Sequence, residues 1–197
     1  MPPAQFATFL ILCPTCFFLG ILFTNWAYDH HTLWSSSLPS EAVLAAVETH
    51  YTMLAKAPPI LTRLFNAVVV TGLLGFFVKL YRPSESNMLF DGSSLVLYMI
   101  GVIMYGTNVI RGLRTVESGE YGQDVGRVDT LRVMAATHVI LALVLVGVLV
   151  LQAGQWYAER KQGEEMAKLV EEEEKERIKE EEQEGKRRVT RSSKKRV

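Results

Sequence analysis

Two cysteines form the stretch Cys13-Pro14-Thr15-Cys16, whose spacing is that of dithiol redox sites. Redox chemistry needs a thiolate stabilised by a nearby cation or helix N-terminus, together with access for a partner. Here the pair lies within FATFLILCPTCFFLGILF (6–23), which carries no charge and disfavours a thiolate. We therefore expect two unreactive cysteines on either side of a proline kink.

A second group of titratable residues, Tyr28-Asp29-His30-His31, follows this stretch, and His50 and His138 lie further along. A metal site would need three or four converging ligands, whereas adjacent histidines on a helix point in different directions. We expect a polar junction at the membrane interface, with no metal and no cofactor. No nucleophile–base pair or Gly-rich phosphate loop can be argued from the sequence, so we do not expect an enzyme.

The apolar stretches carry uncharged polar residues and glycines. We expect no Asp, Glu or Lys deep within them, which disfavours an ion-coupled carrier or a proton relay. Amides, hydroxyls and glycines are instead what helices use to associate in lipid, either within one bundle or with another membrane protein. The polar residues are Asn66, Thr71, Thr107, Asn108, Gln152 and Gln155, and the glycines are Gly72, Gly75, Gly101, Gly106, Gly147 and Gly154.

Four stretches are long and apolar enough to cross a bilayer, which takes about 20 residues. A chain of 197 residues cannot cover four helices that are apolar on every face, so we predict an all-α membrane protein with four spans. The expected spans are residues 6–23, 60–78, 89–110 and 133–157. We interpret the first as an uncleaved signal anchor, because it lacks a basic n-region and a small-x-small cleavage site.

The charge is concentrated at the C-terminal end, where residues 159–197 hold 13 of the 21 basic and 12 of the 21 acidic residues. We predict a membrane domain over 1–158 and a charged cytosolic tail over 159–197. Acid-to-base pairs four residues apart favour an exposed helix over 164–184. The basic segment after Gly185 is expected to be disordered.

The tail also decides the expected orientation. Basic residues near the spans are almost balanced, and the tail places both termini in the cytosol. The loop between the first two spans then lies in the lumen, where Ser40 and Pro58-Pro59 bound a predicted amphipathic helix. Its apolar face consists of Val43, Leu44, Val47, Tyr51 and Leu54. The loop over 111–132 is expected to be a flexible surface connection.

Lys194 and Lys195 stand fourth and third from the carboxyl end. This spacing fits the dilysine signal that returns membrane proteins to the endoplasmic reticulum. We interpret the two lysines as a candidate retrieval signal, which agrees with a cytosolic C-terminus.

Three stretches together resemble one family: FTNWAYDHHTLW (23–34), LFDGSSLVLYMIGVIMYGTNVIRGL (89–113) and AATHVILALVLVGVLVLQAGQWYA (135–158). They are similar to the fungal Shr-type packaging chaperones of the endoplasmic-reticulum membrane, which are dedicated to amino-acid permeases. The resemblance covers about residues 6–158, and the tail matches only in composition.

The resemblance implies a non-enzymatic role in which the membrane domain prevents aggregation of nascent amino-acid permeases. It also implies that the tail meets the COPII coat of vesicles leaving the endoplasmic reticulum. We expect the bilayer as a further partner and no nucleic acid. Our hypothesis is that Asn66, Thr107, Asn108 and Gln152 contact the client. The alternative is a small lipid-handling enzyme or a channel or transporter subunit, which would need a charged or nucleophilic constellation in the membrane.

Overall fold

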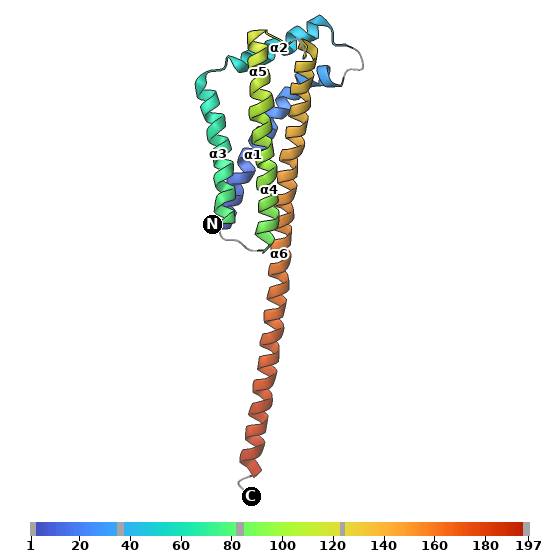
Figure 1. Cartoon of the computed structure of the whole chain (residues 1–197). Coiled ribbons are helices and arrows are strands. Elements are labelled where there is room, and N and C mark those ends of the chain that lie inside the picture. Colours follow the sequence, from blue (N-terminus) through green and yellow to red (C-terminus); the bar gives the residue numbers. More distant parts are fainter. Residues whose placement is uncertain (1–2, 35–37, 82–84, 123–124, 195–197) are drawn as a thin grey trace. The chain divides into compact units, whose positions relative to one another are not determined.

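A computed structural model describes the backbone of residues 3–34, 38–81, 85–122 and 125–194, and the side chains of 6–34, 38–81, 88–122 and 125–179. Every regular element in these ranges is helical (Figure 1). In chain order the elements are α1 (Pro3–Leu33), α2 (Glu41–Ala55), α3 (Pro59–Leu80), α4 (Glu85–Met104), the π-helical turn η1 (Tyr105–Val109), α5 (Ile110–Ser118) and α6 (Arg127–Lys194).

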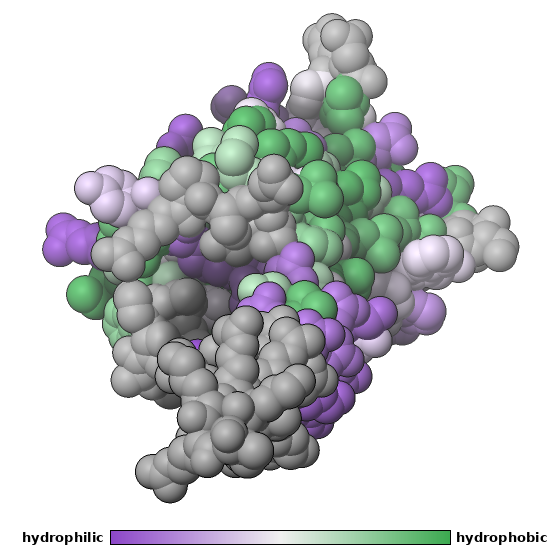
Figure 2. Space-filling view, turned by 90° about the horizontal axis from the view of Figure 1, so that it is seen from below, coloured by the Kyte–Doolittle hydropathy of each residue, from purple (hydrophilic) through white to green (hydrophobic). Residues whose placement is uncertain are grey.

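Four helical segments have the length and composition of membrane spans: Phe6–Leu33, Pro59–Leu80, Met88–Ser118 and Arg127–Lys179. Only 17 to 39% of the residues in the most apolar window of each span are buried, so most of these side chains need lipid around them. Figure 2 shows hydrophobic residues on the outer surface of the helices. The predicted class, an all-α protein with four spans, is confirmed.

The spans extend further toward α2 than the sequence indicated. The helix α1 continues to Leu33, and the third span continues through η1 and α5 to Ser118. The connection before α6 is therefore shorter than the expected flexible loop over 111–132. These extensions are stabilised because α2 packs against them, which buries apolar faces that would otherwise meet water.

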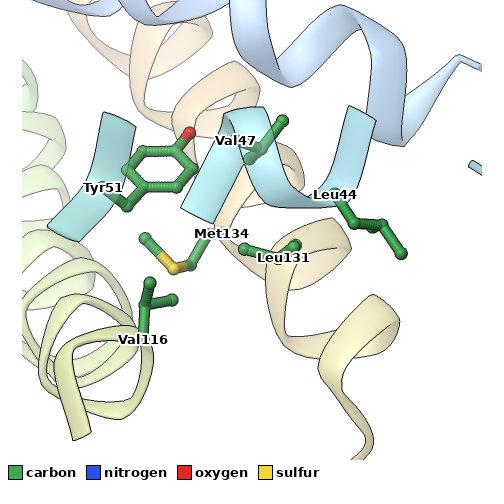
Figure 3. Close-up of a cluster of buried hydrophobic side chains, with 6 residues drawn as sticks. All are labelled: Leu44, Val47, Tyr51, Val116, Leu131 and Met134. Carbon is green, nitrogen blue, oxygen red and sulfur yellow. The ribbon is translucent and has the colours of Figure 1, made fainter. Parts of the chain in front are cut away.

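The helix α2 closes this end of the bundle, which we call the α2 end (Figure 1). It begins after Ser40, although the Ser40 side chain makes no capping hydrogen bond. Its buried face meets α5 and α6 in one apolar cluster (Figure 3). The cluster consists of Leu44, Val47, Tyr51, Val116, Leu131 and Met134. Leu54, which was expected on the same face, is 36% exposed.

A second apolar cluster lies among the spans, with Ile11 of α1, Phe76 of α3, Tyr98 of α4, and Leu145 and Val148 of α6. Close approach at this level depends on glycine. A Cβ built on Gly75 would lie 2.9 Å from a side-chain carbon of Ile11, and one built on Gly72 would overlap the Tyr98 ring. Small residues at helix contacts therefore serve the bundle's own packing, as the sequence indicated.

Two glycines in the spans do not serve this packing. A Cβ built on Gly20 of α1 or Gly106 of η1 would meet nothing within 4 Å. Gly106 was among the glycines expected at helix contacts, and its exposed position in the π-helical turn differs from that expectation.

By its internal contacts the chain divides into two units, Met1–Gln155 and Trp156–Val197. In the second unit, α6 is exposed along Glu159–Lys179 and carries the predicted Lys175–Glu171 ion pair at 2.6 Å. The helix continues beyond Gly185 to Lys194, where the sequence had indicated disorder. One glycine costs a helix about 1 kcal/mol, which does not end it between helix-forming neighbours.

Candidate functional site

A buried ion pair joins three spans at the end of the bundle opposite α2. Lys79 Nζ, at the end of α3, lies 2.8 Å from Asp91 Oδ1 of α4, and the two side chains are 6% and 0% exposed. Lys79 also donates to Gln152 Oε1 at 2.9 Å and to Gln155 Oε1 at 2.7 Å. Gln152 Nε2 donates to Asp91 Oδ1 and Ser94 Oγ, and Gln155 Nε2 donates to Asp91 Oδ2. We call these five residues the Lys79 cluster.

The Lys79 cluster corrects the expectation that no Asp or Lys lies deep in a span. Lys79 had been assigned to a loop and Asp91 had been overlooked at the start of an otherwise uncharged stretch. Folding brings them together, because an isolated charge in lipid costs several kcal/mol and pairing offsets much of that cost. The available signal was one acid and one base at facing ends of consecutive spans.

Gln152, expected to contact a client, lies inside this cluster and is 3% exposed. Its amide oxygen accepts from Lys79, and its amide nitrogen donates to Asp91 and Ser94. In this conformation Gln152 stabilises the bundle and presents no amide atom to a neighbouring molecule.

A second buried cluster joins α1, α2 and α6 near the α2 end. Tyr51 OH donates to Asp29 Oδ1, and His138 Nδ1 lies 2.8 Å from Asp29 Oδ2. The hydroxyl of Tyr51 is also 3.5 Å from His138 Nδ1. Beside them, His50 Nε2 is 3.1 Å from Asn25 Oδ1. We call Asn25, Asp29, His50, Tyr51 and His138 the Asp29 cluster.

The Asp29 cluster does not have the chemistry of an enzyme or metal site. Burial raises the pKa of Tyr51, and the negative charge of Asp29 raises it further, so the phenol stays protonated. Among the described residues, no group of three or more His, Cys, Asp or Glu is placed to hold a metal ion. The sequence identified Asp29 as part of a polar junction. It did not identify Tyr51 or His138 as its partners, because those contacts join residues 22 and 109 positions away.

An ion-pair group fastens α2 from outside the spans. The Arg127 guanidinium donates to both carboxylate oxygens of Glu48 and to Glu41 Oε2, each at 2.7 Å. Tyr121 OH also donates to Glu48. The hydrogen bonds from Arg127 lower the pKa of the Glu48 carboxyl below its usual 4.5, against the opposing effect of burial. This group fixes α2 to the first turn of α6.

Three expected client-contact residues are exposed on the spans: Asn66 on α3, and Thr107 and Asn108 on η1. The Thr107 hydroxyl donates to the Ile103 carbonyl at 2.8 Å. Asn108 Nδ2 donates to Thr137 Oγ1 at 3.3 Å, while its Oδ1 makes no hydrogen bond within the described part of the chain. A π-helical turn widens the helix by one residue and is often found at functional sites. The structure therefore leaves polar groups of three residues on the outer surface.

The remaining sequence candidates have simple positions. Cys13 and Cys16 are free and exposed on α1. Thr15, between them, is buried and donates to the Ile11 carbonyl. Lys194 is the last residue of α6, and Lys195 lies outside the described residues.

Comparisons with known proteins agree with this architecture. A family model described as "SHR3_chaperone: ER membrane protein SH3" matches residues 3–192. The secretory component protein psh3 of Schizosaccharomyces pombe is 29% identical over 148 residues, which cover 75% of this chain and 67% of that protein. No solved structure matches the chain. The resemblance indicated by three sequence stretches is confirmed, and the chain belongs to the SHR3 chaperone family of endoplasmic-reticulum membrane proteins.

Proposed function

We propose that this protein is a membrane chaperone for amino-acid permeases, which it protects from aggregation and passes to COPII vesicles. The observation that carries the proposal is the distribution of polar groups in the spans. The buried charges are paired within the bundle. Uncharged amides and hydroxyls are exposed at Asn66, Thr107 and Asn108.

This distribution suits reversible contact with an unfinished membrane protein. A permease whose bundle has not closed exposes backbone and side-chain polar groups that lipid cannot satisfy. One interhelical hydrogen bond in a membrane contributes about 0.6 kcal/mol, so a few such bonds hold a client weakly and release it once its own helices pair. Gln152 contributes indirectly, by keeping the bundle closed through the Lys79 cluster.

The orientation and tail complete the proposal. Both termini lie in the cytosol, and α2 lies in the lumen, as the tail's positive charge favours. The exposed charged helix over Glu159–Lys179 offers a surface for coat components outside the membrane. Lys194 and Lys195 act as the retrieval signal. The family and the name of the psh3 relative support a role in secretion.

The client surface is tested by combining Asn66→Leu, Thr107→Val and Asn108→Leu in the full chain. We expect permease co-purification to fall several-fold and permease to accumulate in the endoplasmic reticulum as aggregates. Each substitution removes a polar group from an exposed position, so the chaperone's own level should stay unchanged.

A matched control replaces exposed apolar residues on the same helices, Leu64→Val and Ile103→Val, without removing a polar group. The control should deliver permeases normally. Normal delivery and normal co-purification by the triple variant would exclude these residues as the client surface.

A further inference from the structure

A groove of about 440 Å³ lies between α1 and α6, within the membrane-spanning part of the bundle. Gly20, Phe23 and Trp26 of α1 line one side, and Val139 and Ala142 of α6 line the other. Phe23 is 79% exposed, and Gly20 has open space in front of it. The groove is therefore apolar along its length and accessible from the lipid.

The polar end of the groove is formed by Asp29 and His138. Both oxygens of Asp29 have partners, from Tyr51 and from His138 Nδ1. His138 Nε2 makes no hydrogen bond within the described residues. No buried side-chain nitrogen or oxygen there lacks a partner, so Nε2 must be accessible from the groove.

The protonation of this ring follows from its neighbour. A carboxylate only accepts hydrogen bonds, so a neutral His138 donates from Nδ1 to Asp29 and keeps a lone pair on Nε2. The groove thus presents one hydrogen-bond acceptor at the end of an apolar channel. A matching ligand carries one hydroxyl at one end of an apolar body.

The direction of the groove matches the bilayer. From Leu19 to Asp29, α1 rises about 15 Å toward the α2 end, at 1.5 Å per residue. The apolar part lies toward the middle of the spans, and the polar end lies toward α2, outside them. A lipid in a bilayer has the same arrangement, with its polar group at the interface and its apolar body inward.

We propose that this groove binds one sterol molecule, whose hydroxyl donates to His138 Nε2 and whose rings lie between α1 and α6. A phospholipid fits less well, because its phosphate would approach the Asp29 carboxylate and no cationic side chain lines the groove. A client helix also fits less well, because a helix about 10 Å wide would need the groove to continue along the whole span. Phe23 and Trp26 supply flat faces for a rigid ring system.

The test uses the purified full chain in lipid nanodiscs with a photoactivatable sterol, and locates the labelled peptides by mass spectrometry. Labelling is expected on α1 and α6 near Gly20 and Ala142. Gly20→Leu should reduce it about tenfold, because the new side chain enters the groove without meeting a protein atom at its Cβ. Ala142→Phe fills the groove from the other side and should have the same effect.

Gly92→Leu is the matched control, since Gly92 is another glycine in a span with nothing within 4 Å of its Cβ, and it should label normally. Unlabelled sterol should compete, whereas its methyl ether, which has no hydroxyl to donate, should compete poorly. Equal competition by the ether would overturn the contact with His138. Normal sterol labelling of Gly20→Leu with loss of permease co-purification would overturn the sterol site and place a client helix in the groove.

Discussion

The Lys79 cluster and the Asp29 cluster are two solutions to burying a carboxylate in one small bundle. Asp91 is paired with a lysine, and both side chains are enclosed by the amides of Gln152 and Gln155. Asp29 is paired with a histidine and a tyrosine, and one ring nitrogen stays accessible from a lipid-facing groove. The first cluster is closed, and the second is open at one atom.

The difference indicates separate roles. A closed, fully hydrogen-bonded ion pair between α3, α4 and α6 specifies how these spans meet, and it has no atom left for a ligand. The open cluster holds α2 on the bundle, because Tyr51 belongs to α2, and it presents a polar atom beside an apolar surface. The closed cluster should therefore govern folding, and the open one should govern what the surface binds.

Lys79→Met should have the largest effect. It leaves Asp91 buried without a counter-charge, and removing one partner of a buried pair costs about 3–5 kcal/mol. We expect low steady-state levels and a much lower midpoint of thermal unfolding in detergent.

The control adds Asp91→Leu to Lys79→Met, which removes both charges. This double variant should recover most of the lost stability, since two apolar residues can replace a buried pair at little cost. If the double variant unfolded as readily as the single one, the ion pair would not be what specifies this end of the bundle.

The elements of the fold could be predicted from the sequence better than the clusters. An unbroken aliphatic run such as 139–151 needs no partner to be identified as a span, because lipid satisfies it. The helix over Glu41–Ala55 followed from Pro58-Pro59 and the helical spacing of Leu44, Val47 and Tyr51. These signals are local, and the structure agrees with them.

The clusters depend on contacts that local reasoning cannot supply. Gln152 looked like an intramembrane amide available to a client until the fold placed Lys79 and Asp91 against it, 73 and 61 positions away. The extension of α1 to Leu33 likewise depends on α2 covering it. Asn66 and Asn108, whose surroundings are lipid, are exposed as an uncharged amide in a span would be for contact with another helix.

Asp29→Asn should have a smaller effect than Lys79→Met. The neighbours left behind, Tyr51 and His138, are neutral, and an amide oxygen can still accept from the phenol. We expect a loss of about 1–3 kcal/mol in the free energy of unfolding, measured by thermal or denaturant unfolding in detergent. Asp29→Leu, which leaves Tyr51 OH with no acceptor from Asp29, should cost more than Asp29→Asn. An equal or larger loss than that of Lys79→Met would mean that the two clusters do not differ in role.

Acidification should loosen α2 in two small steps. Burial lowers the pKa of His50 below 6.5, so neutral His50 favours the folded state above that pH and the contribution is lost as pH falls through the lowered pKa. The lowered pKa of Glu48 contributes in the same direction, fully present above 4.5 and lost at more acid pH. The Glu48 effect should be below about 1 kcal/mol because Arg127 is partly exposed to solvent.

Amide hydrogen exchange of α2, corrected for the intrinsic effect of pH, measures this loosening. Exchange should rise below pH 6.5 and again below 4.5 in the parent protein. Glu48→Gln should show faster exchange at neutral pH and no second rise, since its amide keeps a hydrogen bond to Arg127 but does not titrate. A second rise in that variant would assign the acid effect to another group and separate the docking of α2 from the Arg127 ion pairs.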